Sequence, residues 1–559
     1  MPITSPVATM DLAQQLLSEL RRRGVTTIFG VPGRESAFLL FNEVPGLRHI
    51  TARTEFTAGM MACHLGRLTR VPQVAFCTMG PGATNMVTPV ATAMLNRSPM
   101  ILISAQLESD DRLYNITHQC VDQRTLFESV TKWSHELSHP ESLRWDLARA
   151  FAVAQAEPPG PVHLSIPVDF LKAQVSGDYD IDSTIPAAAS APTTVDAHAL
   201  RLVRSVLEVA ERPICIFGDE ITRAGCNATA RGFVEAWALP TLTAASIKGL
   251  LPDDHPLALG SVSPYMEGIL GEPVLDRIFG PADVVVCVGV QYVDDILPRM
   301  WTRGQDKEVV VLSGTPLSDE RDRFDATVES VGPLDQQLMI LSDATQRASA
   351  LRGRNYQWLR DVYRRREARH SAQKGLDPVA AVGVLNRHIA CGAALVVDIG
   401  FFRHHAILFA KPARAGRLFT ETALSSFGSG LGAALATKLE EPESDVFLLA
   451  GDGGFHSTSA DLSTAVRYGL SVVVIVLNSC SYELIGRYQE RGGKGINRDV
   501  VTLASVDFVR LAQANGWAGV RVNDPEEMAE ALDMRDRSRP FLVEADCCYD
   551  DGDYFAEAY

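Results

Sequence analysis

Short runs rich in β-branched residues alternate with helical patterns along the chain, and this alternation limits the folds open to it. Such runs are typical of buried strands, whereas segment 11–24 places Leu12, Leu16 and Leu20 on one helical face. Parallel strands need a crossover, which is usually a helix. The pattern therefore predicts an α/β fold of parallel sheets covered by helices. The predicted strands are 27–31, 73–79, 100–105, 162–166, 214–219, 284–290, 308–314, 394–400, 445–453, 471–479 and 541–546.

Two interruptions divide this alternation into three blocks. Residues 176–196 are rich in Ser, Pro, Ala and Asp, which is typical of a linker. A charged helical stretch over 355–375 leads into the last block. We expect three doubly wound parallel-sheet domains. The predicted parts are a first domain over 1–175, a linker over 176–196, a central domain over 197–350, a third domain over 351–548 and a tail over 549–559.

Charge and hydropathy exclude some partners. The 559 residues carry a formal net charge of −16, and a nucleic-acid or membrane-surface binder would need a basic field instead. No apolar run approaches the ~18–20 residues that span a bilayer. The first twenty residues lack the basic start and apolar core of a signal peptide. We expect a cytoplasmic protein with neither nucleic acid nor membrane as partner.

Glycines and oxygen-bearing side chains follow two predicted strands of the third block. Gly451-Asp452-Gly453-Gly454 comes after one strand, and Asn478-Ser479-Cys480-Ser481 ends the next. Glycines at a strand-to-helix turn let backbone N–H groups approach a phosphate. Asp452 between them is suited to Mg²⁺, which would bridge to a diphosphate. The two loops predict a diphosphate–metal site at the carboxyl edge of a sheet.

These motifs resemble those of thiamine-diphosphate enzymes. Asp452-Gly453, a gap of 24 residues and Asn478 match the family's metal signature, and Glu55 lies between the motifs at 29–33 and 80–85. The chain is similar to the acetolactate-synthase-like group. The resemblance implies a pyrimidine-binding first domain, a Rossmann-like central domain and a diphosphate-binding third domain. It also implies thiamine diphosphate and Mg²⁺ as cofactors, and a homodimer or homotetramer with active sites between chains.

The resemblance also assigns cofactor contacts. Glu55 would hydrogen-bond N1′ of the aminopyrimidine, and Phe419 would be the apolar wedge that bends the cofactor. Asp452, Ser479 and Ser481 would bind the metal, with Ser479 in place of the family's second Asn. Further cofactor contacts are expected from Gly400, Phe401, Phe402, Ser425, Ser426, Phe427, Gly453, Gly454 and Tyr482.

Other segments resemble the carboxyethylarginine-synthase branch, which opens clavulanic acid (antibiotic) biosynthesis. They are Thr117–Cys120, Tyr265–Leu270, Tyr292–Trp301, Gly400–His404 and Gly453–Ser457. This resemblance implies a transferase that joins glyceraldehyde 3-phosphate to the α-amine of arginine or a related amine, with loss of phosphate.

The same resemblance suggests roles for substrate-facing residues. Arg403 would bind the phosphate, and His118 and His404 would transfer protons, with Gln119 orienting them. The guanidinium group of arginine would be held by Asp295 and Tyr265, and Tyr549 would lie in the active site.

Two alternatives remain open at this stage. One is a carboligase or decarboxylase of the acetolactate-synthase type that acts on 2-oxo acids. The other is a non-catalytic relative, which only Ser479 supports.

Overall fold

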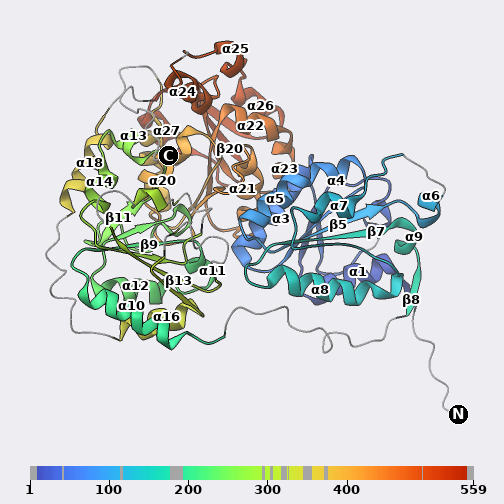
Figure 1. Cartoon of the computed structure of the whole chain (residues 1–559). Helices are drawn as coiled ribbons and strands as arrows, with labels where there is room; N and C mark the ends of the chain where they lie inside the picture. The colour runs from blue at the N-terminus through green and yellow to red at the C-terminus, as the bar shows by residue number, and fades with distance from the viewer. Residues whose placement is uncertain are drawn as a thin grey trace. The chain divides into compact units, whose positions relative to one another are not determined.

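Three six-stranded sheets organise the chain, and within each sheet neighbouring strands are parallel (Figure 1). This confirms the predicted fold class. The computed structural model describes residues 9–40, 43–113, 118–176, 193–291, 296, 298–301, 306–316, 324, 326–343, 356–369, 375–493 and 495–549.

The first sheet lies within the predicted first domain and has the strand order β3-β2-β4-β5-β7-β6. Its strands are β2 (Thr27–Gly30), β3 (Arg48–Thr51), β4 (Gln73–Cys77), β5 (Met100–Gln106), β6 (Trp133–Glu136) and β7 (Pro161–Pro167). A separate antiparallel pair joins β1 (Thr9–Asp11) to β8 (Gln174–Ser176). The helices of this region are α1 (Leu12–Arg22), α2 (Ala37–Leu40), α3 (Glu55–Thr69), α4 (Pro81–Asn85), α5 (Val87–Leu95), α6 (Ser109–Leu113), α7 (Gln123–Glu128), α8 (Leu143–Gln155) and α9 (Val168–Leu171).

Helix α1 shows why the sequence folds as predicted here. Asp11 caps its start by accepting a hydrogen bond from the Gln14 N–H at 2.7 Å. The helix ends before Gly24, whose φ of +90° suits glycine after a helix C-terminus. Leu12 and Leu16 are fully buried, as their spacing predicts.

The central sheet has the order β11-β10-β9-β12-β13-β14, the 3-2-1-4-5-6 arrangement of Rossmann folds. Its strands are β9 (Pro213–Phe217), β10 (Thr241–Thr243), β11 (Ala258–Ser261), β12 (Val284–Val288), β13 (Glu308–Ser313) and β14 (Val328–Val331). Helices α10 (Ala197–Val209), α12 (Asn227–Trp237) and α16 (Leu334–Ser342) lie together on one face (Figure 1). The remaining helices of this region are α11 (Glu220–Arg223), α13 (Met266–Leu270) and α14 (Val274–Phe279).

The third sheet has the order β16-β15-β17-β18-β20-β19. Its strands are β15 (Ala394–Val397), β16 (Leu418–Thr420), β17 (Val446–Gly451), β18 (Val473–Asn478), β19 (Ala518–Val522) and β20 (Phe541–Asp546). Helices α18 (Gln357–Glu367) and α19 (Pro378–Ile389) precede it. The others are α20 (Phe401–Phe409), α21 (Ser429–Glu440), α22 (Asp452–Thr458), α23 (Leu462–Arg467), α24 (Glu483–Arg491), α25 (Arg498–Val501), α26 (Phe508–Ala514) and α27 (Pro525–Met534).

The first and third sheets share one topology. Numbered by their place in the chain, the strands of both have the order 2-1-3-4-6-5. In each, the direction in which strands are added first reverses between the first and third strands, which are β2 and β4 in one sheet and β15 and β17 in the other. Ligands of open α/β sheets bind at the carboxyl ends of strands beside such a reversal.

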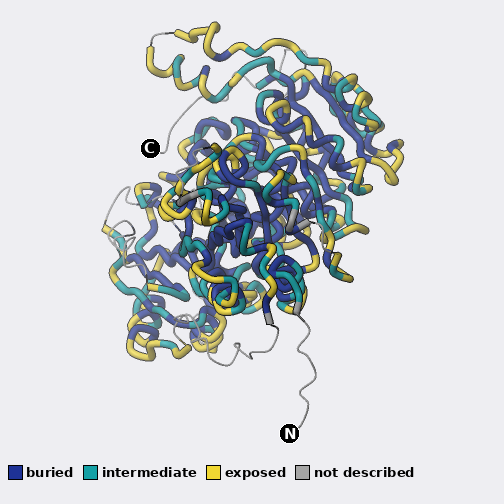
Figure 2. Tube along the Cα trace, turned by 90° about the vertical axis from the view of Figure 1, so that its right-hand side faces the viewer, coloured by how far each residue is buried: buried dark blue, intermediate teal, exposed yellow. Residues whose placement is uncertain are grey.

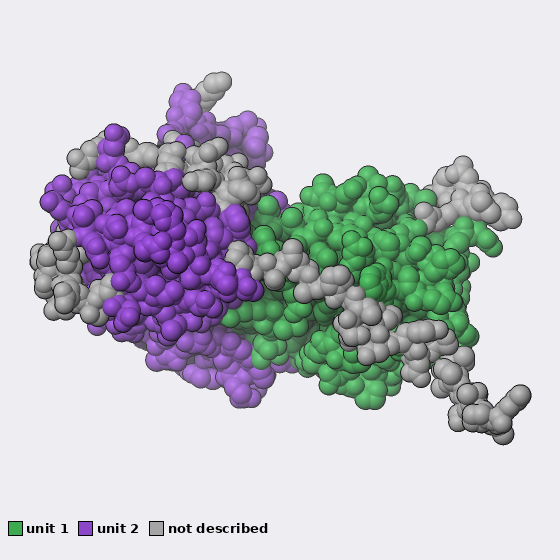
Figure 3. Space-filling model, turned by 60° about the horizontal axis from the view of Figure 1, so that its bottom comes forward, with its two compact units in different colours: residues 1–190, 431–440, 458–468 green, residues 191–430, 441–457, 469–559 purple. Residues whose placement is uncertain are grey.

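The chain divides into two compact units (Figure 3). Unit 1 is formed by residues 1–190, 431–440 and 458–468, and unit 2 by 191–430, 441–457 and 469–559. Two short segments of the predicted third domain therefore group with the first sheet. Most of the predicted linker and tail, 177–192 and 550–559, lies outside the described residues.

The strands supply much of the buried core. Every residue of β4, β5, β7, β9, β12 and β18 is buried, and Figure 2 shows such buried stretches in dark blue. Among the described residues, no helix is both long enough and apolar enough to cross a bilayer.

Candidate functional site

Glu55 is the first residue of α3 in unit 1. Thr54 caps this helix, and its hydroxyl accepts a hydrogen bond from the Thr57 N–H at 3.2 Å. The Glu55 carboxylate accepts a hydrogen bond from Asn85 Nδ2 at 3.1 Å. A Cβ placed on Gly82 would lie 3.6 Å from Glu55 Oε1. The predicted carboxylate therefore lies against the turn formed by the glycine-rich segment 80–85, and it is partly exposed.

Gln119 packs against the same turn. Gly80 has a φ of +60°, and a Cβ there would lie 2.8 Å from Gln119 Cβ. Gln119 itself has a φ of +54°, an uncommon conformation for a side chain that carries a Cβ. Backbone strain of this kind often occurs at functional sites. The neighbouring His118 is exposed.

Asp461 is a fully buried carboxylate in unit 1, and the sequence did not predict its role. Its Oδ1 accepts a hydrogen bond from the Arg53 N–H at 2.7 Å, and its Oδ2 accepts one from the Thr54 hydroxyl at 3.1 Å. Both donors directly precede Glu55, so Asp461 positions the start of α3. No local pattern signals a contact over such a sequence distance.

Asp452 is the first residue of α22 in unit 2, directly after β17. Its carboxylate faces the backbone N–H groups of Gly453 in its own helix and of Ser481 and Cys480, which follow β18. Burial raises the pKa of Asp452, and these N–H groups partly offset the rise. Because β17 and β18 are hydrogen-bonded neighbours, their carboxyl ends bring the two predicted loops together.

The predicted metal ligands occupy this junction. Ser479 Oγ donates a hydrogen bond to the Ser481 carbonyl oxygen at 3.1 Å, so these two oxygens are already close. Asn478 turns toward the fully buried Glu544 instead, with its Nδ2 3.1 Å from Oε1. One carboxylate, one hydroxyl and one carbonyl are hard oxygen donors, which fit Mg²⁺. Within the described ranges, no group of three His, Cys, Asp or Glu residues could hold a metal.

Asp398 directly follows β15 and contacts the first residues of α21 and α22. Its carboxylate accepts hydrogen bonds from the N–H groups of Gly428 at 3.0 Å and Gly430 at 3.3 Å. A Cβ on Gly454 would lie 2.7 Å from Asp398 Oδ2. Burial raises the pKa of Asp398 to about 6. Glycine is required at 454 because α22 and this carboxylate approach so closely.

The glycines on both sides of the strand reversal pack against one ring. A Cβ on Gly451 would lie 2.9 Å from Phe402 Cε1, and Gly400 is also in contact with this ring. A Cβ on Gly453 would lie 2.7 Å from Tyr482 Cε1. Glycine is needed at these positions because the rings of Phe402 and Tyr482 lie directly against the backbone.

The predicted wedge, Phe419, and the predicted cofactor contact Phe427 differ in exposure. Phe419 lies within β16 and is 7% exposed, whereas Phe427 is 48% exposed. The Phe427 ring lies 6.3 Å from that of Tyr482, which is also exposed. In the turn before Phe427, the Glu421 carboxylate accepts hydrogen bonds from the N–H groups of Ala423, Leu424 and Ser426. This turn presents Phe427 to solvent.

The predicted substrate residues His404 and Arg403 are buried in unit 2. Ser263 Oγ and His404 Nδ1 are joined by a 3.0 Å hydrogen bond. Burial, together with the neighbouring Arg403, lowers the pKa of His404 well below its ordinary value. The Arg403 guanidinium donates to the Glu421 carbonyl oxygen at 2.7 Å. In this structure both side chains have protein partners, and their roles toward a substrate stay predictions.

Near His404, aromatic side chains surround the guanidinium group of Arg487. Arg487 lies 4.8 Å from the ring centre of Phe401 and 5.2 Å from that of Tyr549, and it pairs with Glu483 at 2.9 Å. Tyr265 packs edge-on against His404, with ring centres 4.3 Å apart. We call Tyr265, Phe401, Glu483, Arg487, Tyr488 and Tyr549 the guanidinium cluster; the Tyr265 and Tyr488 hydroxyls are 2.7 Å apart. The predicted Asp295 lies outside the described residues.

Family models match all three sheets. Residues 10–126 match the thiamine pyrophosphate enzyme N-terminal TPP-binding domain, 200–334 the central domain and 398–545 the C-terminal TPP-binding domain. The chain is also 31% identical to a probable 2-ketoarginine decarboxylase of Pseudomonas aeruginosa, over 94% of this chain and 92% of the relative.

The chain belongs to the thiamine pyrophosphate enzyme family.

Within this family the chain is of the acetolactate-synthase-like type. It is 28% identical to the acetolactate synthase isozyme 3 large subunit of Escherichia coli, over 95% of this chain and 94% of the relative. A solved thiamine diphosphate-dependent 4-hydroxybenzoylformate decarboxylase of Rhodococcus jostii RHA1 shares the fold with a TM-score of 0.81 at 20% identity, covering 97% of this chain and all of that one. The expected cofactor, thiamine diphosphate, agrees with the two TPP-binding domains.

Proposed function

We propose that this thiamine-diphosphate enzyme also uses Mg²⁺ and joins glyceraldehyde 3-phosphate to the α-amine of arginine, giving N2-(2-carboxyethyl)arginine and phosphate. The two products contain all the atoms of the two substrates, so the reaction needs no oxidant or reductant. The observation that carries the proposal is the guanidinium cluster. It brings Tyr265 and Tyr549, two of the predicted substrate residues, to a place suited to a guanidino group.

The chemistry of the cluster matches that of an arginine side chain. A guanidinium stacks on aromatic faces and pairs with carboxylates. In this structure Phe401, Tyr549 and Glu483 offer these contacts to Arg487. A substrate guanidinium could bind beside Arg487 or in its place. The 2-ketoarginine in the name of the relative from P. aeruginosa also has a guanidino group.

Thiamine diphosphate, when bound, supplies the carbon nucleophile that attacks a substrate carbonyl. Glu55 would hold a proton against N1′ of its pyrimidine, and Asn85 would fix the carboxyl group in place. Asp452, Ser479 and the Ser481 carbonyl would hold Mg²⁺ against the diphosphate. We assign the wedge to Phe427 rather than Phe419, because a wedge needs an exposed face.

Two steps need groups outside the cofactor contacts. Phosphate departure needs a cation, and Arg403 would supply it only if its guanidinium can reach the substrate while bonded to the Glu421 carbonyl. Proton transfers suit His118, which is exposed to solvent, better than His404, because burial lowers the pKa of His404 well below its ordinary value. Gln119, beside the 80–85 turn, would orient the transferred proton.

The test is product analysis with the full chain, thiamine diphosphate and Mg²⁺. Incubation with glyceraldehyde 3-phosphate and arginine should release phosphate and form a carboxyethylated arginine in equal amounts, measured by mass spectrometry. Tyr549→Ala should raise the KM for arginine with little effect on phosphate release. Phosphate release without a C–N product would refute the synthase assignment.

The second candidate is decarboxylation or carboligation of a 2-oxo acid. Two observations favour it: the relative from P. aeruginosa is named as a probable 2-ketoarginine decarboxylase, and the Arg403 guanidinium is bonded to a main-chain carbonyl oxygen rather than open to a phosphate. Incubation with 2-oxo-5-guanidinopentanoate or pyruvate, with CO₂ measured, decides between the candidates. Turnover of either acid, with no reaction of the phosphorylated aldehyde, would establish this candidate instead.

A further inference from the structure

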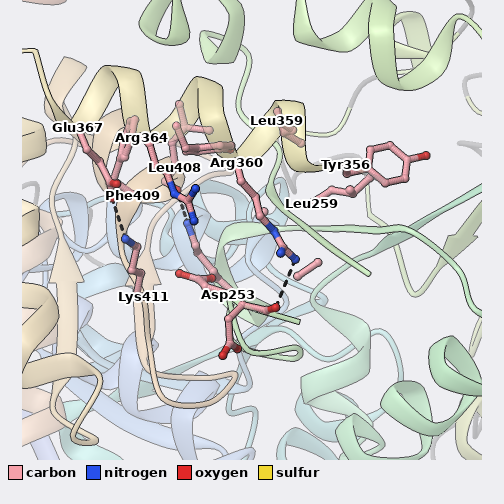
Figure 4. A pocket seen from close by; sticks show the side chains of 15 residues that line it. Asp253, Leu259, Tyr356, Leu359, Arg360, Arg364, Glu367, Leu408, Phe409 and Lys411 are labelled. Carbon is pink, nitrogen blue, oxygen red and sulfur yellow. Dashed lines mark hydrogen bonds and ion pairs between the residues drawn. The ribbon is translucent and has the colours of Figure 1, made fainter. Parts of the chain in front are cut away.

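A cavity of about 370 Å³ lies in unit 2 beside β11, an edge strand of the central sheet. Its walls come from residues 248–260, from α18 and from the end of α20 (Figure 4). None of the predicted cofactor or substrate residues lines it. Pockets of small-molecule sites have volumes of roughly 300–1,000 Å³. The apolar wall residues are Ala258, Leu259, Leu359, Leu408 and Phe409.

A buried lysine contributes to this cavity. Lys248 Nζ donates hydrogen bonds to the carbonyl oxygens of Ile407, at 2.7 Å, and Leu408. These carbonyls belong to the last turn of α20, whose last four carbonyls lack helical partners. An ammonium group has three N–H donors. Two of them are used by these carbonyl oxygens, which leaves one for another acceptor. Burial lowers the pKa of Lys248 to about 8, which reflects an incompletely compensated charge.

The cavity also contains a polar group that has no hydrogen-bond partner among the described residues. The hydroxyl of Tyr363 is shielded from solvent and makes no hydrogen bond. It lies beside Gly260, where a Cβ would come within 3.0 Å of it. The Tyr363 ring packs edge-on against Phe409, with centres 5.3 Å apart. A buried hydroxyl without a hydrogen-bond partner is unfavourable, and a bound acceptor would remove this cost.

Charged side chains of both signs line the rim of the cavity. Lys411 pairs with Glu367 at 2.7 Å, and Arg360 donates to the His255 carbonyl oxygen at 2.7 Å. Figure 4 shows the first pair at one side of the pocket. Asp253, the acidic residue nearest in chain to Lys248 on the rim, is exposed. The groups shielded from solvent are thus donors, and they favour an anion over a cation.

We propose that this cavity binds a small carboxylate with an apolar body, the carboxylate meeting Lys248 Nζ and the Tyr363 hydroxyl and the body packing against Leu359 and Phe409. A single buried cation suits a carboxylate better than a phosphate, whose second charge would find no partner inside. The site is separate from the cofactor edge and does not depend on the proposed reaction.

Calorimetric titration of the full chain without substrates tests this. The probes are 4-methylpentanoate and 4-methylpentanamide, which share one shape, and the second has no charge. The acid should bind at least about tenfold more tightly, because charge-assisted hydrogen bonds are stronger than neutral ones. Equal affinities for the two probes would overturn the proposal. So would the absence of acid binding at about 10 mM, a concentration at which even a weak site is occupied.

Variants locate the carboxylate. Tyr363→Phe removes a hydroxyl that has no protein partner, so folding should be unaffected while the affinity for the acid falls several-fold. Lys248→Met should abolish the preference for the acid over the amide. The control is Lys172→Met, a lysine of unit 1 outside the cavity that is paired with Glu108 at 2.7 Å, which should keep that preference. Unchanged acid binding in Tyr363→Phe and Lys248→Met would place the acid elsewhere and refute the site.

Discussion

Glu55 and Asp452 occupy equivalent places in different units: each is the first residue of a helix that follows a strand of its sheet. Their surroundings differ. Glu55 has one side-chain donor, Asn85, and is partly exposed, whereas Asp452 is buried and faces the N–H groups of residues 480 and 481. A buried carboxylate that faces backbone N–H groups is suited to bind a cation, and one beside a single side-chain amide keeps an oxygen for a ligand.

The role of Glu55 predicts a large kinetic effect of a small change. Glu55→Gln keeps the size and the contact with Asn85 but cannot exchange a proton, so turnover should fall by about 10²–10⁴-fold. Cofactor affinity, measured by calorimetry, should change much less. The control is Glu141→Gln, an exposed glutamate. Turnover close to that of the unmodified protein would contradict the pyrimidine-activating role.

Ser479 stands where the family resemblance places a second Asn. A serine hydroxyl is a weaker metal ligand than an amide oxygen, and here it also donates to the Ser481 carbonyl. Ser479→Asn should lower several-fold the Mg²⁺ concentration that gives half-maximal stabilisation by thiamine diphosphate in thermal unfolding. Ser205→Asn, on the exposed face of α10, should have no effect. A higher Mg²⁺ requirement in Ser479→Asn would argue that residue 479 is not a metal ligand.

At the scale of elements, the sequence predicts buried strands well and edge strands poorly. β12 and β18 are buried along their whole length and were found from their apolar runs. β6 and β19 lie at the edges of their sheets and are only partly buried. Neither has a continuous apolar run; the sequence of β6, for example, is WSHE. β16 has three residues and is too short for any periodicity. Their positions follow from pairing with neighbours, which is a tertiary effect.

The residues of the candidate site also divide into those that the sequence predicts and those that it does not. The loops at Asp452 and Ser479 could be predicted because each directly follows a strong strand, and neighbouring strands end at one edge. Asp398 and Asp461 could not, since their partners lie 30 or more residues away in the chain. The exposed Phe427 was distinguishable from the buried Phe419 only when β16 had been located.

His163 in β7 links three strands of the first sheet and should make unit 1 sensitive to acid. Its Nε2 is 2.7 Å from Ser104 Oγ in β5, and its Nδ1 is 2.9 Å from Ser134 Oγ in β6. Burial lowers its pKa to about 3. The unfolded chain binds a proton near pH 6.5 and the folded chain does not, so stability falls as pH drops from about 6.5 toward 3.

The loss from this residue should reach about 2 kcal/mol at pH 5, because each pH unit below the unfolded pKa costs about 1.4 kcal/mol. Native-state hydrogen exchange of β5 and β7 at pH 7 and pH 5 measures it. His163→Gln, which cannot be protonated, should reduce the pH dependence by this amount, whereas the exposed His198→Gln should not. An identical pH dependence in His163→Gln would show that residue 163 is not responsible.

At the scale of the whole molecule, Glu55 belongs to unit 1 and Asp452 to unit 2. The family resemblance predicts that a complete site combines Glu55 of one chain with Asp452 of another. Mixing inactive Glu55→Gln chains with inactive Asp452→Asn chains, after dissociation and reassociation, should then restore activity. In a dimer with random pairing, half of the dimers are mixed and have one intact site of two, so about a quarter of the original activity should return. No recovery would indicate sites built within single chains.

The central claim is that the loops after β17 and β18 hold the diphosphate through Mg²⁺, and calorimetric titration with thiamine diphosphate tests it most directly. The unmodified chain should bind the cofactor saturably with Mg²⁺ and far more weakly with a chelator. Asp452→Asn should weaken binding by about 10–100-fold, the usual cost of disturbing a metal site. Metal-independent binding, or binding in Asp452→Asn as tight as in the unmodified chain, would contradict the account.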